Sequence, residues 1–279
     1  MKILSKRNIT LFVSIVLILL ITFVVSSYPR VWGQVFSKSE DISKELLALS
    51  KRYYGSKYHI WYGSFENFGI LIFLLLPIAT SSIYAKSYYN KTDIYYIYRE
   101  GFKKYYIKSF LKVVTLLVII MSVPIITYWG VLNILPTTSK IFIEGVASEA
   151  EGIASSITIL NNSIKNLAIH NPNRYVYYTM AVFIISGVNY GIYTYALGNL
   201  MKSKIFRYLA PAISLTIIDF IVGMIIGMIN PNFNASVLFD TFNTVVLLDN
   251  SYIIVFNLCL FLFSLLLVFI HYVKRTKEG

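Results

Sequence analysis

Few side chains in this sequence could carry catalytic chemistry. The one cysteine, Cys259, stands in an apolar run, and the three histidines, His59, His170 and His271, are far apart. The chain has neither the Cys/His spacing of a metal site nor a recognisable nucleophile–base pair. Phosphate-loop, metalloprotease and serine-hydrolase signatures are also missing. The sequence therefore predicts a non-enzyme with no catalytic residues, no metal site and no cofactor of its own.

Asp219 is the one acidic residue that stands deep inside an apolar run. A charge at that depth is costly, so such a residue is expected to face the protein interior. Gly223 and Gly227 follow at helical spacing on the same face and form G-x-x-x-G, which lets another helix approach closely. Counting from the turn near residue 204, Asn189 lies at the same depth, and Ser186 is a second candidate partner. Two roles stay open: polar packing between helices, or a place in a substrate path.

A second cluster of functional candidates is the basic, Tyr-rich segment 94–110, which contains YREGFKKYYIKSF at 98–110. On one continuous helix, its tyrosines and Phe102 would lie mainly on one side and Lys103, Lys104 and Lys108 broadly on the other. One interpretation is an interfacial helix that anchors the topology. The other is a handle for a soluble partner.

The elements that must position these residues are membrane spans. The chain is 57% hydrophobic and only 14% charged, where a soluble domain would carry about 25% charge. Its apolar residues form blocks near the roughly 20 residues that a spanning helix needs. We expect an all-α polytopic membrane protein in the cell membrane, with residues 1–279 forming one domain. The six spans are expected at 9–25, 68–85, 113–134, 175–197, 209–229 and 252–272, and the first is interpreted as a retained span rather than a signal peptide.

The placement of basic residues predicts the orientation. With the N-terminus in the cytoplasm, most of the 25 Lys and Arg residues fall in cytoplasmic segments, and most acidic residues fall outside. This is the positive-inside pattern, so both termini are expected to be cytoplasmic. The net charge of +12 is then explained by topology and by contacts with lipid headgroups, without a nucleic-acid partner.

Two long outer segments are expected to be helical. The apolar residues of 141–168, among them Ile153, Ile157 and Leu160, repeat at alternating spacings of three and four. A shorter stripe of the same kind runs through 39–54. Pairing of the two would form an extracellular helical cap, and the alternative is that each lies flat on the outer leaflet. The aromatic run at 58–68 suits the membrane interface.

The basic segment resembles a family. A span, then a loop with Tyr-Arg-x-Gly-x-x-Lys-Tyr-Tyr-x-Lys, then another span is similar to permease subunits of ABC-2-type exporters, in particular small Gram-positive permeases for peptide export or immunity. The resemblance implies that this loop docks on a separate cytoplasmic ABC ATPase, which binds the ATP and Mg²⁺. It further implies a second permease copy or homologue and an amphipathic substrate such as a peptide or lantibiotic. The residues implied to contact the ATPase are Arg99, Glu100, Gly101, Phe102, Lys104 and Tyr105.

Two other functions stay open from the sequence. An ATP-independent transporter or channel would need ionisable residues in several spans, whereas only Asp219 is present. A membrane scaffold or sensor that acts through an extracellular helical cap is the other alternative. Co-purification of an ATPase with the chain would separate both alternatives from the exporter permease.

Overall fold

The computed structural model describes residues 6–27, 57–65, 71–72, 74–80, 92–134, 167, 171–201, 203–229 and 250–278. All regular structure in these ranges is helical, which agrees with the predicted all-α class. The labelled helices are α1 (Lys6–Ser27), α4 (Lys57–Gly63), α6 (Thr92–Glu100), α7 (Phe102–Ile134), α10 (Pro172–Leu200), α11 (Lys204–Ile229) and α13 (Asn250–Glu278).

Four of these helices, α7, α10, α11 and α13, are long and apolar enough to cross a membrane. They indicate a multi-pass membrane protein and fall where the sequence predicts the third to sixth spans. Helix α1 matches the first predicted span, but its apolar stretch Thr10–Ser26 is shorter than the four long helices. The second predicted span, 68–85, is described only at 71–72 and 74–80, and these residues are helical.

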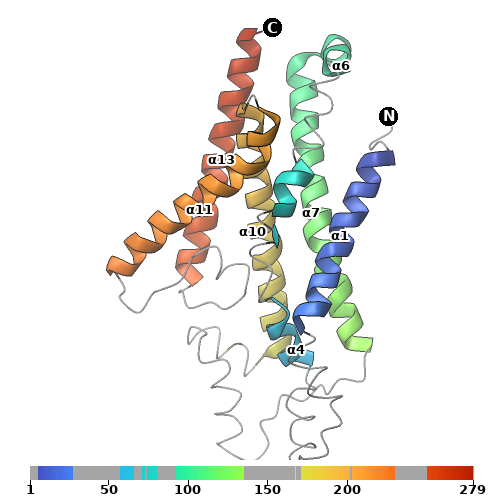
Figure 1. Ribbon diagram of the computed structural model, residues 1–279, viewed down its shortest axis with the longest axis vertical. Coiled ribbons are helices and arrows are strands. Elements are labelled where there is room, and N and C mark those ends of the chain that lie inside the picture. The colour runs from blue at the N-terminus through green and yellow to red at the C-terminus, as the bar shows by residue number, and fades with distance from the viewer. Residues whose placement is uncertain are drawn as a thin grey trace, which may run out of the picture.

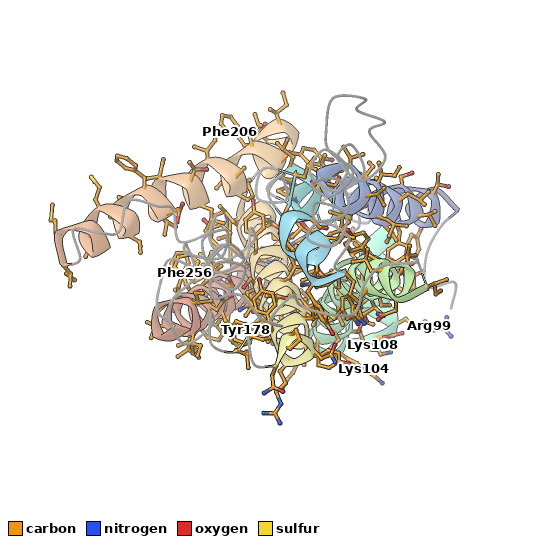
Figure 2. The ribbon with its side chains drawn as sticks, turned by 90° about the horizontal axis from the view of Figure 1, so that it is seen from below. Arg99, Lys104, Lys108, Tyr178, Phe206 and Phe256 are labelled. Carbon is orange, nitrogen blue, oxygen red and sulfur yellow. The ribbon has the colours of Figure 1, made fainter. Side chains whose placement is uncertain are left out.

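Helix α10 lies at the centre of the bundle (Figure 1). It packs against α13, α7 and α11, and α1 packs against α7. Most of α10 is buried, whereas α11 leaves most of its length exposed. Figure 2 shows the reason: α11 runs away from the other helices. Its contact with α10 includes the 2.6 Å hydrogen bond between the hydroxyls of Tyr193 and Ser214.

Two glycines allow α7 to approach α10 closely. A Cβ atom on Gly187 would lie 2.1 Å from Cε of Met121, and one on Gly191 would lie 2.4 Å from Cδ2 of Leu117. Carbon atoms in contact are normally about 3.5–4.0 Å apart, so neither position has room for a side chain. Met121 and Leu117 are one helical turn apart on α7 and are fully buried. Gly187 and Gly191 therefore form a small-residue surface of the kind common between membrane helices.

The aromatic run at 58–68, whose composition suits the membrane interface, packs in part against other helices of the protein. Trp61 and Phe65 are fully buried, and the indole of Trp61 donates a 2.9 Å hydrogen bond to Oγ1 of Thr179 on α10. Phe65 packs edge-on against Phe23 of α1, with ring centroids 5.3 Å apart. Buried aromatic pairs stabilise beyond their area. Helix α4 thus ties α1 and α10 together at one end of the bundle.

The opposite end of the bundle collects the basic segments. The beginning of α1, the corner between α6 and α7, the turn between α10 and α11, and the end of α13 all lie at this end in Figure 1. We call it the basic end. The predicted outer helices 39–54 and 141–168, including Ile153, Ile157 and Leu160, lie outside the described residues apart from residue 167, so the cap stays a prediction.

Candidate functional site

Helix α6 at the basic end presents aromatic rings to the surroundings. It covers Thr92–Glu100, and the side chains of Tyr95 and Tyr98 are 79% and 88% exposed. Ile94 lies one turn before Tyr98 and is 44% exposed. Large apolar side chains gathered on the surface of a short helix are a common sign of an interaction site. This surface, Ile94, Tyr95 and Tyr98, is called the α6 face.

The chain turns sharply between α6 and α7 at Gly101. Its φ of +81° lies in the left-handed region, which a residue without Cβ enters at no steric cost. The Gly101 N–H donates to the carbonyl of Ile97, and the Gly101 carbonyl accepts from Tyr105, so one residue ends α6 and begins α7. Segment 94–110 therefore belongs to two helices, and the placement of its side chains on a single helix does not hold. The break sends the α6 face outward, while Phe102 and Tyr106 turn inward.

An ion pair and a ring stack hold the corner in place. Nζ of Lys108 lies 2.6 Å from Oε2 of Glu100 and bridges α7 to α6. The ring of Tyr96 stacks on that of Tyr105, with centroids 6.2 Å apart and planes within 8°. The hydrogen bond from Lys108 holds the pKa of the Glu100 carboxyl below its usual range. The ion pair is largely exposed, so its contribution is orientation more than stability.

The beginning of α7 is anchored to α13. Phe102 stacks on Tyr272 with ring centroids 5.4 Å apart. The buried hydroxyl of Tyr106 donates to the carbonyl of Val268 at 2.9 Å and lies 2.9 Å from Nδ1 of His271. Sequence reasoning assigned no role to His271, because its partner is 165 residues away. A displacement of the corner would therefore move both α7 and α13.

Basic side chains surround the corner. Arg99, Lys103 and Lys104 are exposed, and Figure 2 shows Arg99, Lys104 and Lys108 on the α7 side of the bundle. A shallow hollow of about 490 Å³ lies between Glu100 and these lysines, with Gly101 and Phe102 in its wall. The six predicted contact residues thus lie together, although Tyr105 and Phe102 are half-buried. The exposed rings and surrounding cations suit a protein surface with apolar and acidic groups.

The intramembrane polar residues meet in an arrangement that differs from the expected one. Nδ2 of Asn189 on α10 donates to the backbone oxygen and to Oδ1 of Asn257 on α13, at 3.3 and 3.2 Å. The expected bond from Asn189 to Asp219 is thus replaced by one to Asn257, a residue that sequence reasoning missed. The register argument assumed that α10 and α11 stay side by side along their length, but α11 runs away from the other helices (Figure 2).

Asp219 itself is buried on α11, with 8% of its surface exposed, as expected for an intramembrane carboxylate. Gly223 and Gly227 follow it along α11 and are half-buried. The close approach at Gly223 and Gly227 stays a prediction, and a small-residue pair with close helix contacts is Gly187 and Gly191 of α10. The same four-residue spacing was present in the sequence and could have revealed that pair.

Comparison of the chain with protein-family models, curated proteins and solved structures finds no match. The resemblance of the basic segment to exporter permeases therefore stays a prediction. The function is inferred from the exposed rings and basic side chains at the corner between α6 and α7.

Proposed function

We propose that the chain is the permease subunit of an ABC exporter and that the corner between α6 and α7 is its docking site for a separate ATPase. The observation that carries the proposal is the α6 face at the basic end of the bundle. Tyr95 and Tyr98 project outward there from a helix that is otherwise clamped to a membrane span. The positive-inside rule would place this end in the cytoplasm, where an ATPase has access.

The corner is suited to transmit motion. Helix α7 continues from Phe102 through 33 residues, which corresponds to a rod about 50 Å long. A force on α6 would reach this rod through Gly101, the Glu100–Lys108 ion pair and the Tyr96–Tyr105 stack. Tyr106 and Phe102 would pass it to α13. Closure of the ATPase on ATP and Mg²⁺ would thereby change the packing of the spans.

The proposal includes six spans with both termini in the cytoplasm and a second permease copy or homologue in the complex. Six spans are too few to enclose a path for a large substrate, so two subunits would share it. The amphipathic peptide or lantibiotic substrate follows from the family resemblance alone. A channel would not need a docking face for a soluble partner at the basic end.

The test is co-purification from the native membrane after mild detergent extraction. We expect the wild-type chain to retain a polypeptide that hydrolyses ATP, and the Tyr95→Ala/Tyr98→Ala double variant to lose it. Tyr177→Ala is the matched control, because Tyr177 is a 61% exposed tyrosine near the other end of the bundle. ATPase activity that is absent from the wild-type preparation, or retained equally by the double variant, would count against the proposal.

A further inference from the structure

A hollow between α10 and α13 opens on the outside of the bundle, and three polar residues lie at its floor. Its volume is about 380 Å³, within the range of about 300–1,000 Å³ common for small-molecule sites. Ser186, Asn189 and Asn257 contribute the polar groups, and the remaining lining side chains are apolar. Ile185, Ile254 and Leu258 stand at the hollow with 56–65% of their surfaces exposed on the outside of the bundle.

The floor contains an unused hydrogen-bonding group. Only 4% of the surface of Ser186 is exposed, yet its Oγ has no hydrogen-bond partner among the described residues. A buried hydroxyl left without a partner is costly, and such groups are usually satisfied by water or a ligand. Buried serines elsewhere in this bundle bond back to the helix, as Ser264 does to the carbonyl of Leu260 at 2.6 Å.

The depth of the hollow and the lack of charged side chains in its lining limit the kind of ligand that it can bind. Ser186 lies fourteen residues from each end of α10, about 21 Å along the helix, so the floor is in the interior of the span. None of the lining side chains is ionisable. An anionic or cationic group would therefore be desolvated there without a counter-charge, which is strongly unfavourable. A hydroxyl or amide could exchange hydrogen bonds with Ser186 while its apolar body lies along Ile254 and Leu258.

We propose that this hollow binds a neutral, lipid-like molecule that carries a hydroxyl or amide group and enters sideways from the bilayer. Ser186 recognises the polar group, and Asn189 and Asn257 fix the separation of α10 and α13 by their mutual hydrogen bond. The site lies 10 or more residues along α13 from the His271 anchor, and it requires no ATPase. The inference is therefore independent of the exporter proposal.

The test uses the full-length chain in phosphatidylcholine nanodiscs and a hexadecanol analogue that carries a diazirine and an alkyne. We expect saturable photolabelling of peptides from α10 and α13 at the hollow, competed by hexadecanol and not by palmitate. Ser186→Ala should weaken probe binding about threefold, which corresponds to about 0.6 kcal/mol. Leu258→Trp should abolish saturable labelling by filling the hollow from its rim.

Ser264→Ala is the matched control, because it removes a buried hydroxyl of α13 that is already satisfied within its own helix. It should label like the wild type, and gel filtration checks that each variant is folded. No saturable labelling at the hollow in the wild type would overturn the site. Equal labelling of Ser186→Ala would overturn the role of its hydroxyl, and competition by palmitate as strong as by hexadecanol would overturn the neutral ligand class.

Discussion

Substitution of alanine for Gly191 tests the close packing of α7 on α10. The added Cβ would lie 2.4, 2.6 and 3.0 Å from Cδ2, Cδ1 and Cγ of Leu117, so the whole end of that side chain must move. Leu117 is fully buried and has little space to turn into. Overpacking of this kind costs about 1–3 kcal/mol. Gly187→Ala should cost less, because its closest contact is the flexible end of Met121.

The assay is thermal stability of purified protein in detergent, read by the fraction that remains monodisperse on gel filtration. In soluble domains somewhat smaller than this chain, 1 kcal/mol shifts Tm by about 2–4 °C, which gives the scale expected for Gly191→Ala. Gly191→Ala combined with Leu117→Val approximately conserves volume, and the two changes should couple favourably by at least about 1 kcal/mol.

The control for this prediction is Gly130→Ala on α7, where a Cβ would meet nothing within 4 Å. It should leave Tm unchanged or raise it slightly, because alanine is the better helix former. Loss of stability as large as that of Gly191→Ala, or no rescue by Leu117→Val, would refute the close-packing argument.

Three further predictions concern the corner at the basic end and the buried carboxylate. Gly101→Ala should strain the corner by about 1–2 kcal/mol, because residue 101 has a φ of +81°, and Gly101→Asn should strain it less. Limited proteolysis after residue 100 compares the two variants. Because the pKa of Glu100 is lowered, its ion pair with Lys108 should persist at the ordinary carboxyl pKa and be lost as pH falls through the lowered value. Spin-label distances between α6 and α7 should lengthen in that lower pH range. In Lys108→Met, which has no ion pair to lose, the same fall in pH should not change them. Asp219→Asn should fold nearly normally and Asp219→Leu should reduce the yield of monodisperse protein, and a silent Asp219→Leu would remove its packing role.

The positions of the long helices could be predicted because the bilayer dictates them. The spans expected at 113–134, 175–197, 209–229 and 252–272 fall inside α7, α10, α11 and α13, since a run of about 20 apolar residues has few other solutions. The helix ends were less predictable. Helix α7 begins eleven residues before the expected span, at Phe102, because amphipathic turns extend a helix beyond the apolar run.

The contacts between helices could not be derived from hydropathy. The fate of an aromatic residue such as Trp61 depends on which helices reach it, and the composition of its segment suits an interface and a core equally. Asn189 meets Asn257 because α10 packs against α13, a tertiary feature that no local pattern encodes. Gly101 did carry a signal, since a glycine after a helical stretch often ends it in the left-handed conformation.

The most direct measurement for the exporter proposal is photocrosslinking from the α6 face in intact cells. A photoreactive amino acid replaces Tyr98, the most exposed ring of that face, and a second chain carries it in place of Tyr177 as the control. The proposal predicts a covalent adduct from position 98 to a polypeptide that binds and hydrolyses ATP, and no such adduct from position 177. Adducts from position 98 to lipid alone, or to the same partners as from position 177, would contradict it.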